Sequence, residues 1–232
     1  MPPSSSNSVA ASRSASRRLI KELDTWSTEQ KEEKGIERLG PVNEGDLMEW
    51  EAVINGRDIG HGYDEGRWLI NISIPSTYPL APPKMTFVTP VVHPNIALQT
   101  GEICLDLLKD AWTPAYSVLE CVRAVRMLLG CPETDSPLNV DVAALLRSGD
   151  VLGTRKLVEF WCRDSDGRQL DVRLGLQMFI SLLVEQYRMI LSNNIANTKL
   201  DLRNKIHEMT TYSRMTSKLM PIYSMILPPL SH

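Results

Sequence analysis

Two segments in which apolar and polar residues alternate constrain the fold of this chain most strongly. Residues 48–54 and residues 68–74 each place apolar side chains at every second position. A period of two is typical of β-strands that have one face on a core and one face in solvent. The glycine-rich stretch NGRDIGHGYDEG joins the two segments. We therefore expect two neighbouring antiparallel strands.

The elements around these strands predict the fold class. Residues 36–42 and 84–88 read as two further strands, and a helix capped by Ser14 or Ser16 is expected to run to about Lys34. After the strands, helical patterns cover residues 113–129, 140–147 and 154–161. The order is helix, strands and then helices, which predicts an α+β fold with an antiparallel meander sheet.

The composition divides the chain into three parts. Residues 1–12 are rich in serine and proline, which predicts disorder, and residues 13–163 form the expected core domain. Residues 164–232 follow with helical patterns at 170–191 and 198–220. This extension carries no chemical motif. It could be a helical segment that packs on the core or a partner, an element that binds a membrane surface or a ligase, or a sequence that is not part of the native protein.

Charge and cysteine content narrow the function classes. The net charge is −3 and the pI is about 5.9, so the chain has no overall basic field for nucleic acid. We expect no membrane span, because the longest apolar stretch, residues 178–184, is far too short. Four cysteines without a C-x-x-C pair give a metal site no support and favour reduced thiols in the cytosol or nucleus.

The candidate chemistry lies in residues 90–108, a long stretch without a regular period. It contains HPNIALQTGEICLDLL, in which Cys104 is the only cysteine. Cys104 could be a buried structural thiol, a metal ligand or a nucleophile. A nucleophile that carries an acyl group as a thioester needs a donor for the oxyanion, and the Asn95 amide could supply it. His93 could be a general base, but a histidine followed by proline favours a structural role. The local signatures of papain-like and caspase-like proteases are missing around Cys104.

These motifs resemble the core of the ubiquitin-conjugating enzymes. The resemblance covers about residues 15–162 and rests on YPLAPP, HPN, ICLD and WTPA, which occur in the order of the family. It implies the family's α+β fold, no cofactor and no metal, since ATP is used upstream by the activating enzyme. Within the family, TGEICLDLLK, DSPLNVD and ALLRSGD look most like the peroxisomal members.

The resemblance implies a role for each matching residue of the active site. Cys104 would carry ubiquitin as a thioester, and Asn95 would stabilise the oxyanion or hold the loop that does. Ser136, with its neighbour Asp135, matches the position that gates the cysteine and could orient an attacking lysine. His93, Pro94 and Asp106 would be structural residues of the active-site loop.

The resemblance also implies partners. Ubiquitin, an activating enzyme, a RING ligase and a peroxisomal membrane anchor protein are expected, and the substrate would be the peroxisomal import receptor. The residues expected to bind the activating enzyme or the ligase are Arg17, Arg18, Lys21, Pro79, Leu80, Thr113, Pro114 and Ala115. The expected location is the cytosolic face of the peroxisomal membrane, with the enzyme peripheral. A conjugating enzyme of another cytosolic pathway and a catalytically silent ubiquitin-binding adaptor remain as alternatives.

Overall fold

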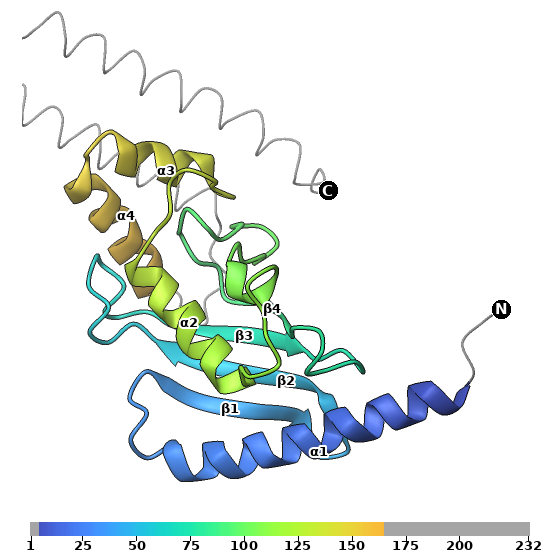
Figure 1. The fold of residues 1–232 in the computed structure, drawn as a ribbon. Helices are drawn as coiled ribbons and strands as arrows, with labels where there is room; N and C mark the ends of the chain where they lie inside the picture. The colour runs from blue at the N-terminus through green and yellow to red at the C-terminus, as the bar shows by residue number, and fades with distance from the viewer. Residues whose placement is uncertain (1–4, 165–232) are drawn as a thin grey trace, which may run out of the picture. The chain divides into compact units, whose positions relative to one another are not determined.

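The computed structural model describes residues 5–164, with side chains from residue 13 to residue 163 (Figure 1). One antiparallel sheet in the order β1-β2-β3-β4 lies at its centre. The strands are β1 (Ile36–Asn43), β2 (Asp46–Asn55), β3 (Arg67–Ser73) and β4 (Lys84–Phe87). Each strand pairs with the next one along the chain, so the sheet is a meander. The predicted α+β class and the four strands are confirmed.

The alternating pattern in β3 separates the two faces of the sheet. Trp68, Ile70 and Ile72 are buried, whereas Asn71 and Ser73 between and after them are exposed. Successive side chains of a strand point to opposite faces, so the apolar set faces the core together. In the adjacent strand, Trp50 is the register partner of Ile72 and is also buried.

Helix α1 (Ser5–Glu29) is longer at its start and shorter at its end than the sequence predicted. It extends into residues that the composition predicted to be disordered, because a run of helix-favouring alanine and arginine residues follows the serines. It stops before Lys34 because the chain turns at its end, where the Glu32 amide donates to the Glu29 carbonyl at 3.0 Å.

Helix α2 (Val118–Gly130) also begins later than the sequence predicted. Ser117 caps it: the Ser117 side chain accepts from the Glu120 amide, and the Glu120 carboxylate accepts from the Ser117 amide. This capping box satisfies amides at the helix start. The Thr113-Pro114 pair, expected to open the helix, therefore lies in the preceding loop. The predicted buried stripe of α2 is present and consists of Leu119, Val122, Val125 and Leu129.

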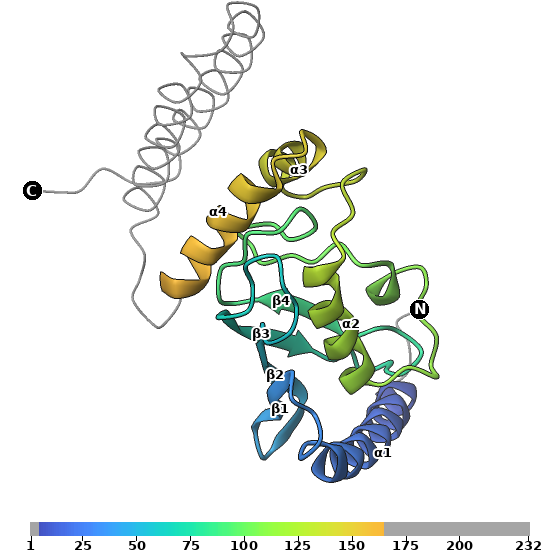
Figure 2. The ribbon, with the colours of Figure 1, turned by 90° about the vertical axis from the view of Figure 1, so that its left-hand side faces the viewer.

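Two helices complete the described part of the chain. Helix α3 (Val140–Arg147) has the predicted bounds, and helix α4 (Val151–Asp164) begins earlier than predicted. Helices α3 and α4 contact each other at the end of the domain remote from α1 (Figures 1 and 2). Helix α2 contacts β1 and β2 as well as α1. The core thus lies between the sheet and α2, with α1 alongside.

The segment between β4 and α2 has little regular structure but is well anchored. Isolated bridges pair Thr86 with Glu102 and Ile96 with Ile103. A short 3-10 helix, η1 (Asp106–Leu108), follows. The bridge from Thr86 holds this segment against the edge strand β4, and the bridge between Ile96 and Ile103 places the HPN motif beside the segment that contains Cys104.

The predicted extension lies outside the described residues, apart from Asp164 at its start. In residues 5–164 no helix is long and apolar enough to cross a membrane. Within the same part of the chain, no three histidine, cysteine, aspartate or glutamate side chains are grouped as metal ligands would be.

Candidate active site

Cys104 lies at the point where a bridged segment ends and η1 begins. Its amide donates to the Asn95 carbonyl at 2.8 Å, and the preceding Ile103 forms a bridge with Ile96. The Cys104 side chain is neither fully buried nor fully exposed. The backbone of Cys104 is therefore fixed by the HPN motif, while the residue remains partly exposed. Partial exposure is a requirement for a reactive cysteine.

The other thiols have different surroundings. Cys121 and Cys162 are buried, and burial raises the pKa of each to about 12. Neither can supply thiolate at neutral pH. Cys131 is exposed. Its position explains the exposure, because Cys131 is the C-cap residue of α2 and follows the last buried turn of that helix.

His93 is fully buried. Its Nδ1 accepts from the Asn95 amide at 3.1 Å, and its ring lies 6.2 Å from that of Tyr63. Burial lowers the pKa of His93 to about 4, and the Leu128 backbone only partly offsets this. A neutral imidazole sealed from solvent cannot collect a proton from an incoming substrate. The geometry favours the structural role over the general base.

Asn95 is also buried, and its side-chain amide is bonded to the loop after α2. The Nδ2 group donates to the Glu133 carbonyl and the Oδ1 atom accepts from the Glu133 amide, both at 2.8 Å. The residue therefore connects the HPN motif to the loop after α2. Of the two roles implied for Asn95, this contact supports the one in which it holds a loop.

The loop that follows α2 is fixed to the HPN motif at both ends. Glu133 binds Asn95 at one end, and the Leu138 and Asn139 amides donate to the Pro94 carbonyl at 2.9 Å and 2.8 Å at the other. Asp135 and Ser136 lie between these two anchors and are exposed. The structure thus attaches the segment of Asp135 and Ser136 to the same tripeptide that fixes the backbone of Cys104.

Two further contacts shape the surroundings of this site. Arg147 of α3 donates to the Thr134 carbonyl at 2.6 Å, which adds a third anchor to the loop. Sequence reasoning missed Arg147, and the only signal for it was its position in the last turn of a predicted helix.

Asp106 is exposed, and its backbone carbonyl accepts from the Lys109 and Ala111 amides, both at 2.9 Å. Asp106 therefore organises the turn through its main chain.

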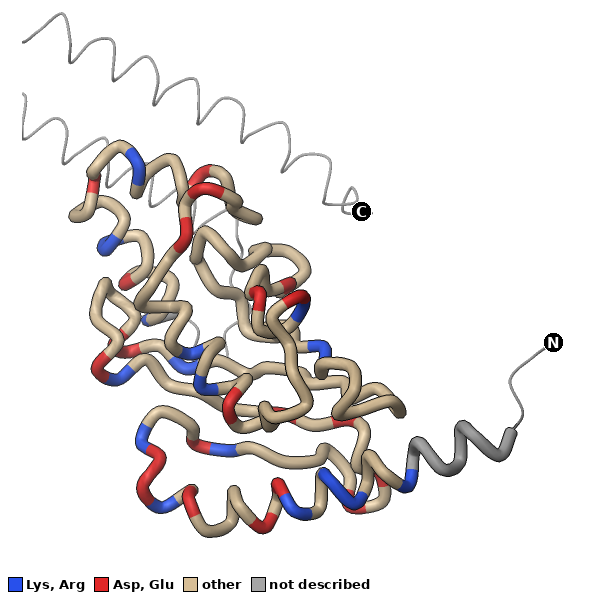
Figure 3. The backbone as a smooth tube through the Cα atoms, in the orientation of Figure 1, with Lys and Arg blue, Asp and Glu red and all other residues tan. Residues whose placement is uncertain are grey.

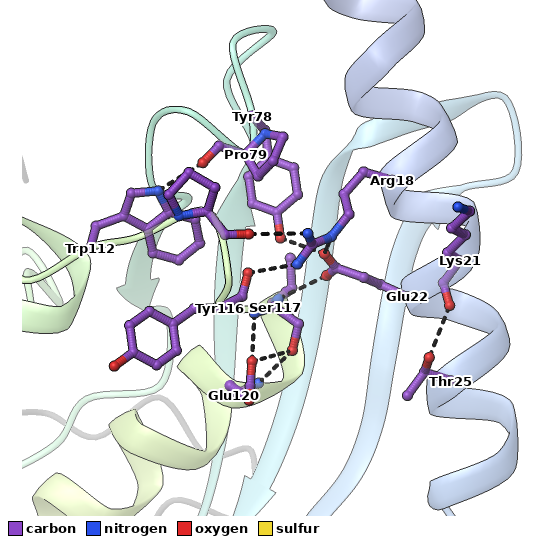
Figure 4. A network of polar contacts seen from close by, with 12 residues as sticks. Arg18, Lys21, Glu22, Thr25, Tyr78, Pro79, Trp112, Tyr116, Ser117 and Glu120 are labelled. Atoms are coloured by element: carbon purple, nitrogen blue, oxygen red, sulfur yellow. Dashed lines mark hydrogen bonds and ion pairs between the residues drawn. The ribbon is translucent and has the colours of Figure 1, made fainter.

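A second surface lies where two loops meet the middle of α1 and the start of α2. Leu80 is 80% exposed, and Thr113, Pro114 and Ala115 are exposed as well. Trp112 joins the two loops by donating from Nε1 to the Pro79 carbonyl at 2.9 Å (Figure 4). The structure therefore brings together the loop residues that the sequence predicted to bind a ligase.

The three basic residues predicted on α1 do not share one environment. Arg17 and Lys21 are exposed, but Arg18 is half-buried and turned toward the loop at Pro114 (Figure 4). Acidic positions are interspersed with the basic ones along α1, so the helix carries both signs of charge (Figure 3). The position of Arg18 depends on Glu22, a buried carboxylate that sequence reasoning missed. Its signal was a glutamate on the buried stripe of Ala15, Leu19 and Trp26.

Comparison with known proteins assigns this chain to a family. Residues 18–159 match the family of ubiquitin-conjugating enzymes. The chain belongs to the ubiquitin-conjugating enzyme family. It is 92% identical over 168 residues to the ubiquitin-conjugating enzyme E2 PEX4 of Gibberella zeae, a match that covers 72% of this chain and 98% of the relative. It is 40% identical over 146 residues to Protein PEROXIN-4 of Arabidopsis thaliana, covering 63% of this chain and 91% of the relative.

A solved structure supports the same assignment. The ubiquitin-conjugating enzyme Pex4p of H. polymorpha, crystallised with the soluble domain of Pex22p, superposes with a TM-score of 0.61 at 34% identity. The superposition covers 65% of this chain and 97% of that one. The predicted family, and the resemblance to its peroxisomal members, are therefore confirmed. A ubiquitin-conjugating enzyme works with ubiquitin and an activating enzyme, and it carries ubiquitin on a cysteine. Among the cysteines whose side chains are described, Cys104 is the one that the HPN motif holds.

Proposed function

We propose that this ubiquitin-conjugating enzyme accepts ubiquitin on Cys104 and transfers it, with a RING ligase, to the peroxisomal import receptor. The observation that carries the assignment of Cys104 is its backbone bond to Asn95. That bond places a partly exposed cysteine beside a buried HPN motif and an exposed loop that the motif holds. A structural thiol would need none of these features.

The chemistry consists of two acyl transfers. The Cys104 thiolate attacks the carbonyl carbon of the thioester between ubiquitin and the activating enzyme, and the thiolate of that enzyme leaves. A lysine amine or a cysteine thiolate of the substrate then attacks the new thioester, and Cys104 leaves as a thiolate. An attacking amine must also lose a proton. A thiol acceptor that arrives ionised needs no base, which suits a site whose HPN histidine is buried and neutral.

The remaining site residues would support these transfers. Asn95 and Pro94 hold the loop of Asp135 and Ser136, and this loop would orient the incoming nucleophile. The Asp135 carboxylate is the stronger proton acceptor of the two. His93 would stabilise the backbone of the HPN motif, and Asp106 would fix the turn after Cys104.

The peroxisomal role rests on the relatives. Curated relatives at 92% and 40% identity carry peroxin names, and a solved relative was crystallised with the soluble domain of Pex22p. We infer that a membrane anchor protein of that kind recruits this enzyme to the cytosolic face of the peroxisome. Leu80 and the segment from Thr113 to Ala115 would bind the RING ligase, with Arg17 and Lys21 contributing positive charge toward a partner.

A reconstituted transfer reaction tests this proposal. The enzyme is incubated with activating enzyme, ubiquitin, ATP, a peroxisomal RING domain, the soluble domain of the anchor and the import receptor. We expect ubiquitin on the receptor, and treatment of the product with thiol distinguishes a cysteine acceptor from a lysine acceptor. A conjugating enzyme of a cytosolic pathway is the matched control. Charging of Cys104 without transfer to the receptor would favour another pathway, and failure to charge would favour the adaptor alternative.

A further inference from the structure

The Glu22 carboxylate is a hydrogen-bonding centre between α1 and two loops (Figure 4). Glu22 is 8% exposed. Its Oε1 atom accepts from Arg18 Nε and from the Tyr78 hydroxyl, both at 2.6 Å, and its Oε2 atom accepts from the Val118 amide at 2.8 Å. A buried carboxylate is tolerated when its lone pairs are used in this way. Glu22 therefore fixes the direction in which the Arg18 side chain points.

Arg18 completes the connection with its other two nitrogens. Nη1 donates to the Pro114 carbonyl at 3.0 Å and Nη2 donates to the Tyr116 carbonyl at 2.9 Å. A planar guanidinium can reach a carboxylate and two carbonyls at once, whereas a lysine ammonium is a single point. The guanidinium thus attaches helix α1 to both sides of Ala115, an exposed residue of the loop.

The loop that contains Pro79 and Leu80 is attached to the same hydrogen-bonded residues. Trp112 donates to the Pro79 carbonyl, and its ring lies 5.9 Å from Tyr78 and 6.1 Å from Tyr116. Tyr78 in turn donates to Glu22. The exposed Leu80 and the exposed Thr113–Ala115 segment are therefore fixed relative to each other through buried or half-buried groups. Neither loop needs a partner to order it.

Arg17 and Lys21 provide a contrast on the same helix. Both are exposed, and in the described part of the chain neither forms an ion pair. Their charges are free to act on a partner, whereas each of the three guanidinium nitrogens of Arg18 donates to a group inside the molecule. A role in steering therefore fits Arg17 and Lys21, and a different role is needed for Arg18.

We infer that Arg18, oriented by Glu22, is a positioning residue that holds the Pro114–Tyr116 loop in the shape a RING ligase binds. This inference deepens the proposed function, because it assumes that the loop meets a ligase. Arg18 then contributes through the shape of the loop and not through its charge. The sequence-based prediction grouped it with Arg17 and Lys21 as a basic contact.

A comparison of charge-conserving with charge-removing substitutions separates the positioning role from a role of the charge. Arg18→Lys and Arg18→Ala are compared with Arg17→Lys and Arg17→Ala. The thioester is formed with activating enzyme, ubiquitin and ATP, and its discharge to free lysine is measured with and without a RING domain that accelerates the wild type. The readout is the ratio of the two rates, in low and high salt. This ratio cancels differences in charging.

The two residues should respond differently. We expect Arg18→Lys to lose about as much of the acceleration as Arg18→Ala, roughly tenfold, with little dependence on salt. Arg17→Lys should retain most of the acceleration, and the loss in Arg17→Ala should shrink at high salt because it is a loss of charge. Arg18→Lys with full acceleration would overturn the inference.

A control excludes general destabilisation of α1. Arg123 of α2 also ties the end of α1 to the domain, through ion pairs with Glu29 at 2.7 Å and with Glu33, just after the helix, at 2.8 Å. Arg123→Lys should leave the ratio of rates unchanged. A loss in Arg123→Lys equal to that in Arg18→Lys would contradict a specific role for Arg18. If the wild type formed no thioester, the proposed function would fail. If the wild type formed the thioester and Arg18→Lys retained the full acceleration, the inference about Arg18 alone would fail.

Amide NMR spectra test the geometry independently of any ligase. Arg18→Lys should shift the amide signals of the Thr113–Ser117 segment while leaving those around Cys104 in place. The same segment should be undisturbed in Arg17→Lys. An undisturbed segment in Arg18→Lys would mean that the guanidinium does not hold the loop, and the inference would be wrong.

Discussion

The side chain of Asn95 and the backbone of Glu133 form two reciprocal hydrogen bonds, each of 2.8 Å. Asn95 thereby uses its amide nitrogen and its amide oxygen on one residue of the loop after α2. The same loop is bound at its other end by the Pro94 carbonyl. The HPN motif is thus the attachment site of the loop that carries Asp135 and Ser136.

Asn95→Ala should impair transfer because it releases this loop. We expect a loss of about 1–2 kcal/mol in the free energy of unfolding, because two hydrogen bonds disappear. Discharge of the Cys104 thioester to free lysine should slow by an order of magnitude or more. Urea unfolding and single-turnover discharge measure the two effects. A normal discharge rate despite lower stability would show that the loop is not needed.

Arg147→Ala distinguishes loop fixing from a direct role of Asn95. Arg147 donates to the Thr134 carbonyl of the loop, so its removal disturbs the loop without removing a hydrogen bond of Asn95. If Asn95 acts by holding the loop, Arg147→Ala should slow discharge in the same direction, by severalfold. Arg155 of α4, which pairs with Glu159, is the matched control, and Arg155→Ala should discharge at the wild-type rate. An Arg147→Ala enzyme with wild-type discharge would favour Asn95 as a direct oxyanion donor.

His93 should make stability depend on pH. Burial lowers the pKa of its imidazole to about 4, from an ordinary value of about 6.5. Between these values the unfolded chain binds the proton and the folded chain does not, so the free energy of unfolding falls as the pH drops from about 6.5 to about 4. Above pH 6.5 this contribution should be flat.

The matched variant is His93→Asn, whose Oδ1 can accept from the Asn95 amide in place of the imidazole Nδ1. We expect the difference between wild type and variant to change by up to about 3 kcal/mol across that pH range. Denaturant unfolding at pH 7, 6, 5 and 4 measures it. Parallel pH dependence in the two proteins would mean that His93 is not kept neutral by burial.

Much of the fold could be predicted from local patterns. The alternation at Trp68, Ile70 and Ile72 defines a strand with one buried face, and the structure confirms it. The predicted helix ends were less accurate, because each end is set by a few local contacts such as a cap. The start of α2 is set by the Ser117–Glu120 capping box, and the sequence offered Thr113-Pro114 as a competing start signal.

The sequence predicted candidate residues for the site, but it did not predict the contacts between them. The motifs pointed to Cys104 and Asn95, yet nothing local indicates that the Asn95 side chain is bonded to Glu133, which is distant in the sequence. Arg18 and Glu22 show the same limit. Their spacing predicts an ion pair on a helix, but the bonds to Pro114 and Val118 depend on how α1 packs against α2.

Leu80 should matter for ligase binding and not for stability. It is 80% exposed, so Leu80→Ala should change the free energy of unfolding by less than about 0.5 kcal/mol. The ligase-stimulated rate should fall about tenfold, as for an apolar anchor at an interface. Met127, which is 70% exposed on α2, is the control, and Met127→Ala should not affect stimulation. Equal stimulation of wild type and Leu80→Ala would remove Leu80 from the ligase surface.

The assignment of Cys104 as the ubiquitin acceptor is tested most directly by charging. The wild type, Cys104→Ser and Cys131→Ser are incubated with activating enzyme, ubiquitin and ATP and are resolved on gels with and without thiol. Cys131 is the matched control because its thiol is exposed. We expect a thiol-sensitive adduct on the wild type and on Cys131→Ser, and either no adduct or a thiol-stable ester on Cys104→Ser. A thiol-sensitive adduct on Cys104→Ser would contradict the assignment.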